Sequence, residues 1–395
     1  MLVIVAPGQG AQSPGFLRPW LEDPSFAERL EWLSTVAGLD LAHYGTEADA
    51  DTIRQTQIAQ PLLVATGMLA ALEVFPHPHD AFSRIGAVAG HSVGELSAAA
   101  GARVITAEQA MVLVRERGKA MAGAAAVTAT GMTAVLGGDR DEVLGTLDRH
   151  GLTPANDNGP GQIVAAGTTE QLSALAEDPP AKARLTPLSV AGAFHTVHMQ
   201  PAVAHLARLA RAVSTHDPRF PVISNRDGQV VHDGREVVAR IVGQIASPVR
   251  WDLCMTAMLD LGVTGVLEMP PAGTLTGIAK RAMKGVETFA LKTLDQLDDA
   301  RAFCDKHGED NPIDLTPTWR MVVSPGKGTF HRDEAAGSSD HLAPGATVGD
   351  VASSRDRTTV VARHGGQIVE WLVEDGDLVS PGQPLVRLHP HGVAS

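Results

Sequence analysis

The pentapeptide Gly-His-Ser-Val-Gly at residues 90–94 constrains the fold more than any other part of this sequence. An apolar run at residues 85–89 precedes it, and a helix-favouring run at residues 95–100 follows it. A strand can turn sharply into a helix at a serine when the residues two positions away are small, because larger side chains there would collide. The pattern predicts a strand–serine–helix turn that exposes the Ser92 hydroxyl at a helix N-terminus. Glycine and serine also build ordinary strand-to-helix turns, so the neighbouring motifs decide between the two.

Length and charge limit what can surround this turn. A chain of 395 residues is long enough for a large α/β core and a smaller second domain. We expect a cytoplasmic protein, because no apolar run reaches the roughly 18 residues of a membrane span and the start of the chain shows no signal-peptide features. The formal net charge of −13 disfavours nucleic acid and anionic membranes as partners. Cys254 and Cys304 form no CxxC pair, so we expect neither a disulfide framework nor a metal site.

The first 300 residues alternate helical patterns with short apolar runs, which predicts a mostly parallel sheet in a hydrolase-like α/β body. Residues 126–196 have their own order of strand, helix, strand, strand, helix and strand. That order is typical of a ferredoxin-like unit, so we expect a small subdomain inserted in the larger one. Its strands are expected at residues 132–136, 154–158, 163–166 and 185–190, and its helices at residues 139–150 and 170–176. Helices of the body are expected at residues 16–36, 61–75 and 107–122, among others.

The composition changes after residue 300. We expect a charged, aperiodic linker at residues 301–316, followed by a small all-β domain at residues 317–391. Segments 344–351 and 381–388 both begin with Pro-Gly and continue with spaced apolar residues, which indicates an internal repeat. The small domain is therefore expected to consist of two similar halves joined by a turn at residues 353–357.

Three further motifs supply partners for a reactive serine, which needs a base, an oxyanion site and a group that selects the substrate. Gln9 lies in the loop Gly-Gln-Gly-Ala-Gln after the first strand, where parallel sheets form ligand crevices. Arg117 lies on a predicted helix, 25 residues after Ser92. His195 ends the motif Gly-Ala-Phe-His, where the chain returns from the inserted unit to the body.

These motifs, in this order, resemble those of the malonyl-CoA:acyl carrier protein transacylases and of the acyltransferase domains of polyketide and fatty acid synthases. The resemblance covers about residues 1–300. Besides GQGAQ, GHSVGE and GAFHT, it includes the segments at residues 57–61, 114–118, 156–164, 247–251 and 276–281. One departure is Met-Pro-Pro-Ala at residues 269–272, where the family usually has a Gly-Pro-Gly turn.

The resemblance implies a role for each motif. Ser92 would take the acyl group as an ester, and His195 would act first as general base and then as acid. The backbone N–H of Val93, together with Gln9, would form the oxyanion hole. Arg117 would bind the free malonyl carboxylate, because a guanidinium pairs with a carboxylate bidentately and keeps its charge when buried.

The surroundings of these residues are less determined. Asn158 and Gln162 are candidates for substrate binding, but they are equally suited to building the turn between two strands of the small unit. The family orients its histidine through backbone carbonyls, which we expect here near residues 247–250. A base must be neutral, so we expect the rate to fall as the pH drops through about 6 to 7, the range in which an ordinary histidine is protonated.

The C-terminal segment resembles a biotinyl/lipoyl carrier domain, with the match in residues 360–385. The lysine that such domains modify is missing from the expected hairpin, which has Arg355, Asp356 and Arg357 in its place. An arginine cannot be biotinylated or lipoylated by the same chemistry. We therefore expect an unmodified domain that docks a protein partner or packs on the rest of the chain.

Taken together, the resemblances imply an acyltransferase that moves malonyl from CoA to the phosphopantetheine thiol of an acyl carrier protein, without a bound cofactor. Alternatives are a hydrolase that removes acyl groups from carrier proteins, a transferase for another acyl unit, and a non-enzymatic scaffold. Arg117 argues against the hydrolase, and the complete set of motifs argues against the scaffold. Val93 and Phe194 resemble the pattern for unbranched malonyl, so methylmalonyl is expected to be the poorer substrate.

Overall fold

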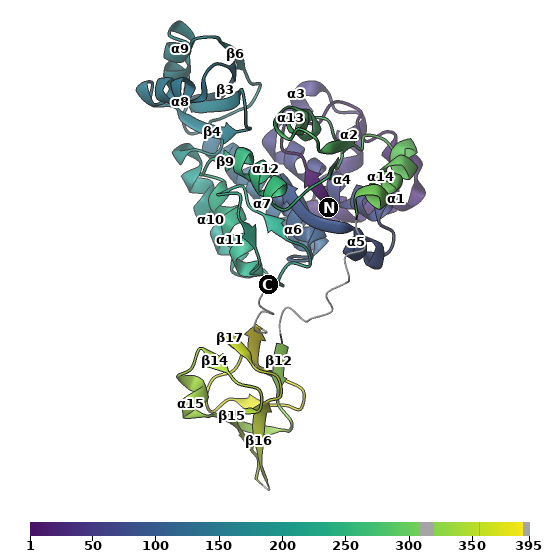
Figure 1. Cartoon of the computed structure of the whole chain (residues 1–395), viewed down its shortest axis with the longest axis vertical. Coiled ribbons are helices and arrows are strands. Elements are labelled where there is room, and N and C mark those ends of the chain that lie inside the picture. The colour runs from purple at the N-terminus through teal and green to yellow at the C-terminus, as the bar shows by residue number, and fades with distance from the viewer. Residues whose placement is uncertain (309–319, 355, 390–395) are drawn as a thin grey trace. The chain divides into compact units, whose positions relative to one another are not determined.

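The computed structural model describes residues 1–308, 320–354 and 356–389. The chain divides into two compact units, Met1–Pro312 and Ile313–Ser395 (Figure 1). The first unit contains a large and a small subdomain around separate sheets. The described part of the second unit contains two small sheets and one short helix.

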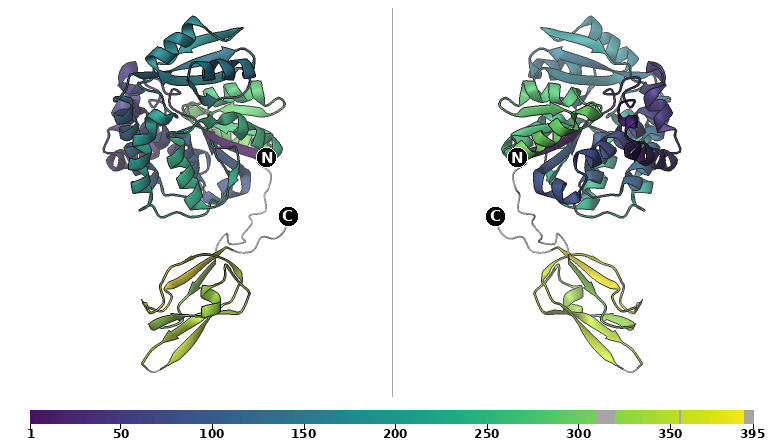
Figure 2. Two further views of the ribbon diagram at one scale, coloured as in Figure 1. Left: turned by 90° about the vertical axis from the view of Figure 1, so that its left-hand side faces the viewer. Right: turned by 90° about the vertical axis from the view of Figure 1, so that its right-hand side faces the viewer.

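A six-stranded sheet forms the centre of the large subdomain (Figure 2). Its order is β11 (Glu287–Ala290), β10 (Gly265–Glu268), β1 (Leu2–Ala6), β2 (Ile85–Gly90), β7 (Val222–Ile223) and β8 (Val230–Val231). The first five strands are parallel, and β8 is antiparallel to β7. Because parallel strands end at the same edge, the loops that follow β1, β2 and β7 lie close together.

Helices cover both faces of this sheet. Leu2 and Ile4 of β1 point into a core with α4 and α7, whereas Val3 and Val5 point into a core with α12 and α13. Burial on both faces is typical of a parallel sheet. The helices are α1 (Pro24–Ala37), α2 (Leu41–Thr46), α3 (Ala50–Arg54), α4 (Thr56–Val74), α5 (Pro78–Arg84), α6 (Gly94–Gly101), α7 (Ala107–Ala125), α10 (Gln200–Ala210), α11 (Gly234–Gln244), α12 (Trp251–Asp260), α13 (Thr274–Ala282) and α14 (Leu297–His307).

Two of the predicted helices differ from those of the structure at a proline. The helix expected at residues 16–36 is divided, because Pro24 begins α1 and Asp23 caps it by accepting from the Phe26 N–H. The helix expected to begin at Pro61 begins five residues earlier, and Pro61 lies inside α4. In the described part of the chain, α4 alone is long and apolar enough to cross a membrane, but 78% of that stretch is buried within the protein. It is a core helix that packs on α7 and α6.

The small subdomain has the order strand, helix, strand, strand, helix, strand. Its elements are β3 (Thr130–Gly137), α8 (Arg140–Arg149), β4 (Thr153–Asp157), β5 (Gln162–Thr168), α9 (Thr169–Glu177) and β6 (Ala183–Pro187). The sheet order is β6-β3-β5-β4, with each neighbouring pair antiparallel. A fifth strand, β9 (Val249–Arg250), comes from the large subdomain and pairs in parallel with β4, so the two subdomains share this sheet.

The first part of the expected linker is wrong. Residues 301–307 continue α14, and Ala300 and Cys304 are buried in the core of the first unit. The buried residues of α14 are Ala300, Cys304 and His307, and this short apolar face left little periodicity in the sequence. Residues 309–316 of the expected linker lie outside the described residues.

Two four-stranded sheets form the second unit over residues 320–354 and 356–389. One has the order β12 (Arg320–Val323), β19 (Pro384–His389), β17 (Gly366–Trp371) and β14 (His341–Leu342). The other has the order β16 (Arg357–Ala362), β15 (Ala346–Ala352), β13 (Gly328–Arg332) and β18 (Leu378–Val379). A short helix, α15 (Glu334–Gly337), follows β13.

The strand order of this unit contains an internal repeat. Strands β12, β13, β14 and β15 of the first half correspond to β16, β17, β18 and β19 of the second half. Exchanging each strand for its counterpart converts the order of one sheet into that of the other. The two echoing segments of the sequence fall on β15 and β19, which are equivalent under this exchange. Arg355, in the turn between the halves, lies outside the described residues.

Candidate active site

Ser92 occupies the sharp turn between β2 and α6. Its φ of 55° lies in the left-handed region, which residues other than glycine rarely adopt. A Cβ on Gly90 would collide with the backbone of Gly94, and a Cβ on Gly94 would collide with the carbonyl of Ala6. Strand and helix therefore approach too closely for any other residue at these two positions, which is the geometry of a nucleophile elbow and not of an ordinary turn.

Asn225, which the sequence analysis missed, holds this elbow from the neighbouring strand. It follows β7, and its Oδ1 accepts the Ser92 N–H at 2.7 Å. Its Nδ2 donates to the Gly90 carbonyl at 2.7 Å, and its own N–H donates to Glu95 Oε1 at 2.8 Å. One fully buried side chain thus satisfies the N–H of the strained Ser92 and the carbonyl two residues before it. The signal in the sequence was a polar residue directly after a strand that neighbours the serine's strand.

Glu95 is a buried carboxyl group next to this network. Burial raises its pKa to about 7, while the Asn225 N–H and the positive charge of Arg117 act in the opposite direction. Its second carboxyl oxygen has no hydrogen-bond partner among the described residues. Glu95 therefore changes its charge near neutral pH. It is connected to Ser92 through Asn225, which bonds to both residues.

His195 lies against the serine. Its Nε2 is 2.8 Å from Ser92 Oγ, and its Nδ1 is 3.0 Å from the backbone carbonyl of Gln244. Since a carbonyl can only accept, it favours the tautomer with a proton on Nδ1 and leaves Nε2 free to take the serine proton. The Gln244 side-chain nitrogen is also 3.0 Å from Nδ1. The carbonyl expected near residues 247–250 is thus supplied three residues earlier, at the end of α11.

The pKa of His195 differs from the sequence-based expectation. Burial, followed by the positive charge of Arg117, lowers it to about 3. The imidazole is therefore neutral throughout the physiological range, so protonation of His195 gives no reason to expect a loss of activity through pH 6 to 7. The backbone of His195 has a φ of 63°, so both residues of the 2.8 Å contact have left-handed backbone.

Arg117 is almost completely buried, with 1% of its surface exposed. It extends from α7, and one terminal nitrogen donates to Ser92 Oγ at 3.2 Å and to Gln244 Oε1 at 3.4 Å. Its Nε and its other terminal nitrogen have no hydrogen-bond partner among the described residues. Burial lowers its pKa to about 10, so it stays positively charged at neutral pH. A buried cation with free donors is a site for an anionic group.

The oxyanion hole is expected from the backbone N–H of Val93, which is the N-cap residue of α6, together with Gln9. Gln9 follows β1 and Val93 follows the serine, and neither N–H has an acceptor among the described residues. The Gln9 side chain is directed elsewhere: its Nε2 donates to the Arg54 carbonyl and to Thr56 Oγ1 at 3.2 and 3.3 Å. The backbone N–H of Gln9, and not its side-chain amide, is therefore the donor available for the oxyanion hole.

Asn158 and Gln162 lie in the β4–β5 turn, on the small subdomain. The Asn158 N–H donates to the Gln162 carbonyl at 3.0 Å, which closes the turn. Asn158 Oδ1 lies 2.9 Å from His91 Nε2, and Gln162 Oε1 accepts from Arg281 at 2.8 Å. Both residues line the cavity at the serine. The hydrogen bond between them shows the turn-building role, and substrate binding stays a prediction.

The cavity that contains these groups has a volume of about 370 Å³ and lies between the two subdomains. The large subdomain contributes loops after β1 and β2 and part of α13, and the small one contributes strands β3 to β5. Its lining includes Gln9, His91, Ser92, Asn158, Gln162 and His195. The nucleophile and the neutral base line this cavity, and the buried Arg117 donates to the nucleophile. This arrangement suits acyl transfer from an anionic acyl group.

Comparison with known proteins agrees with this chemistry. The sequence model of a family described as "acyl transferase domain" matches residues 3–299. A malonyl CoA-acyl carrier protein transacylase of Mycobacterium tuberculosis is 48% identical over 299 residues, which are 76% of this chain and 99% of the relative. The corresponding protein of Bacillus subtilis is 33% identical over 303 residues, 73% of this chain and 93% of the relative.

Solved structures give the same result. The crystal structure of the M. tuberculosis protein matches with a TM-score of 0.73 at 47% identity, covering 76% of this chain and 99% of that one. A malonyl-transacylase solved in complex with its type II PKS acyl carrier protein matches with a TM-score of 0.70 at 28% identity, with the same coverage. The sequence match ends at residue 299 and so leaves the second unit outside it. This chain belongs to the acyl transferase family, as shown by its first 300 residues with their elbow serine and buried histidine and arginine.

Proposed function

We propose that the protein transfers malonyl from CoA to the phosphopantetheine thiol of an acyl carrier protein through an ester on Ser92. One observation carries the proposal: Ser92 Oγ is 2.8 Å from the His195 base and 3.2 Å from the buried Arg117. The first contact activates the hydroxyl, and the second places a carboxylate-binding group beside it. The 48% identity with a malonyl CoA-acyl carrier protein transacylase supports the same donor and acceptor.

In the first half-reaction, Ser92 Oγ attacks the thioester carbonyl of malonyl-CoA while His195 Nε2 accepts the hydroxyl proton. The negative charge that develops on the carbonyl oxygen is stabilised by the N–H groups of Gln9 and Val93. Collapse of the tetrahedral intermediate breaks the carbon–sulfur bond. The CoA thiolate leaves and takes the proton from His195, which leaves malonyl esterified to Ser92 and the imidazole neutral.

The second half-reaction reverses these steps with a different thiol. The phosphopantetheine thiol gives its proton to His195 Nε2 and attacks the Ser92 ester. The same two N–H groups stabilise the second intermediate, and the serine oxygen leaves with the proton from His195. His195 is neutral at the start of each half-reaction, so its Nε2 can accept a proton in both.

Arg117 selects the acyl group. The free carboxylate of malonyl can pair with the guanidinium nitrogens that have no partner among the described residues. An acetyl group has no carboxylate and would leave this cation unpaired in a buried place, which is costly. Malonyl is therefore preferred to acetyl, and the pairing also orients the thioester carbonyl toward Ser92.

Radiolabelled malonyl-CoA tests the proposal. Incubation of the full-length protein without a carrier, followed by denaturing gel electrophoresis, should give a labelled protein band that disappears in Ser92→Ala. Adding a phosphopantetheinylated carrier protein should move the label to the carrier. Release of free malonate without a carrier would favour the acyl-carrier-protein hydrolase, and absence of any label would favour the scaffold. Labelling by another acyl-CoA in preference to malonyl-CoA would favour a transferase for a different unit.

For the second unit, we propose an unmodified biotinyl/lipoyl-like domain that docks a protein partner. Its two sheets have equivalent strand orders, which agrees with a fold built from two similar halves. The one lysine in residues 313–395 is Lys327, which lies between β12 and β13 and not in the turn between β15 and β16. Intact-mass measurement after co-expression with biotin and lipoyl ligases should show no added group, and an added biotinyl or lipoyl mass would overturn this proposal.

A further inference from the structure

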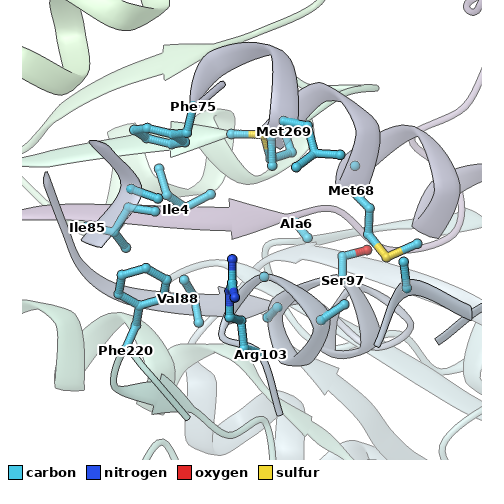
Figure 3. A pocket seen from close by; sticks show the side chains of 18 of the residues that line it. Ile4, Ala6, Met68, Phe75, Ile85, Val88, Ser97, Arg103, Phe220 and Met269 are labelled. Atoms are coloured by element: carbon cyan, nitrogen blue, oxygen red, sulfur yellow. The ribbon is translucent and has the colours of Figure 1, made fainter. Parts of the chain in front are cut away.

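A second cavity lies in the large subdomain, between α4, α5 and α6 and the face of the central sheet. Its volume is about 260 Å³, and it shares no lining residue with the cavity at Ser92. Figure 3 shows the hollow with Phe75 and Met269 on one side and Phe220 and Arg103 on the opposite side. The proposed acyl transfer uses none of these residues.

The lining of this cavity is apolar. The small residues Gly67, Ala71 and Ala100 leave space between the helices, and aromatic and branched side chains form the walls. The lining contains two polar side chains, Ser97 and Arg103. A concave apolar site with a few polar groups at defined places is the usual form of a small-molecule site.

Arg103 supplies the charge of this site. Its guanidinium carbon lies 5.3 Å from the centre of the Phe82 ring, and among the described residues it has no carboxylate within ion-pair distance. The side chain is exposed, so it lies at the rim of the cavity and not in its interior. A rim cation beside an apolar interior matches a ligand with one anionic end and one aliphatic end.

The backbone at Arg103 gives an independent indication that its side chain is used. Arg103 has a φ of 61° and follows the C-cap of α6. Its N–H donates to the Ala100 carbonyl and the Val104 N–H donates to the Ala99 carbonyl, which together form a Schellman motif. Glycine is the usual residue at this position because it adopts positive φ without strain. An arginine here is strained, and its side chain faces the cavity.

We propose that this cavity binds a straight-chain aliphatic carboxylate, with the chain in the apolar hollow and the carboxylate paired with Arg103. A cavity of 150 Å³ holds benzene, with six carbons, so 260 Å³ corresponds to a chain of about ten carbons. The site is separate from the malonyl site and does not depend on it. Its ligand would contact α6, the helix that begins two residues after Ser92.

Calorimetric titration of the full-length protein with sodium decanoate, below its micellar range, tests the proposal. We expect saturable binding of one decanoate per chain. Arg103→Gly should weaken binding at least about tenfold because it removes the charge-assisted pair, and glycine tolerates the backbone at this position. Arg103→Lys should lie between the two. Decanol, the neutral control, should bind the wild-type protein and Arg103→Gly equally.

Filling the cavity provides the second arm of the test. Ala100→Leu places a larger side chain in the hollow and should abolish binding, and Ala71→Leu repeats the test from α4 if the first variant does not fold. Arg117→Ala is the matched control and should bind decanoate as the wild type does. Absence of saturable binding, or equal affinity in the wild type, Arg103→Gly and the filled variants, would overturn the proposal. Loss of binding in Arg117→Ala alone would place decanoate in the malonyl site, and would overturn it too.

Discussion

The two units of this protein differ in which residues adopt left-handed backbone. In the described part of the second unit, positive φ occurs only at glycines, such as Gly345, Gly376 and Gly382. In the first unit it also occurs at Ser92, Arg103, Lys182 and His195. An ordinary side chain in this conformation costs roughly 1–2 kcal/mol. A residue that keeps its side chain there is therefore a candidate for function, and Ser92 and His195 form the proposed catalytic pair.

The largest expected effect comes from removing that pair. Ser92→Ala and His195→Ala should each lower malonyl transfer by at least about a thousandfold, and the double variant should be little worse, because the two residues act as one unit. Steady-state rates with a phosphopantetheinylated carrier protein measure this. Losses that multiply in the double variant would show that the residues act independently.

Ser92→Gly separates strain from chemistry. It should be as inactive as Ser92→Ala but more stable than Ser92→Ala by roughly 1 kcal/mol, since glycine relieves the left-handed backbone. Denaturant unfolding of the two variants measures the difference. Equal stability of the two variants would mean that the backbone at Ser92 is not strained. The positive φ of Ser92 would then not mark a difference in strain between the two units.

Arg117 should have the next largest effect. Arg117→Ala should lower malonyl transfer about 30- to 1000-fold, corresponding to roughly 2–4 kcal/mol, and lower acetyl transfer far less. Arg117→Lys should restore only part of the malonyl rate, because an ammonium lacks the bidentate geometry. Rates with malonyl-CoA and acetyl-CoA give the comparison, and equal losses with both would make Arg117 a structural residue.

A smaller effect is expected at Asn225, which holds the elbow without contacting substrate. Asn225→Ala leaves the Ser92 N–H and the Gly90 carbonyl without their partner, at about 1–3 kcal/mol each. The rate of acylation should fall about 10- to 100-fold while the KM for malonyl-CoA changes little, because the nucleophile is displaced and the carboxylate site is intact. A raised KM with an unchanged acylation rate would assign Asn225 to substrate binding.

The sequence predicted the parts of the site that local backbone geometry or a family motif determines. The elbow could be found from Gly90 and Gly94, and the family resemblance over the first 300 residues is confirmed. Asn225 and Gln244 could not be found this way. Asn225 lies 133 residues from Ser92, and Gln244 lies 49 residues from His195, so both contacts exist only after the sheet and α11 have assembled.

Electrostatic properties were also beyond the sequence. The low pKa of His195 results from burial and from the position of Arg117, neither of which a motif contains. The helical nature of residues 301–307 was missed because the buried face of α14 is short, with Cys304 at its centre and charged residues on either side. In both cases the missing information was which side chains the fold buries.

The pH dependence should be weak. Because the pKa of His195 is about 3, the base is already deprotonated at pH 5, and kcat/KM should change less than about threefold between pH 5 and 8. Glu95 titrates near pH 7, and Glu95→Gln should remove the part of this change that its charge causes. A tenfold loss centred at pH 6 to 7 in both proteins would show that His195 has an ordinary pKa.

The smallest effect on activity should come from removing the second unit, because every group proposed for catalysis lies in the first. Truncation after residue 316 keeps α14 complete and should leave self-acylation by malonyl-CoA within about twofold of the full chain. Truncation after residue 300 is the matched control: it removes the buried Cys304 and most of α14, and should destabilise the first unit by several kcal/mol. Soluble yield, thermal unfolding and the intact mass of the acylated protein measure both. If the protein truncated after residue 316 is insoluble or inactive, the second unit is part of the fold or of the active site. The two units would then not be separable into a catalytic unit with strained backbone and a β unit without it.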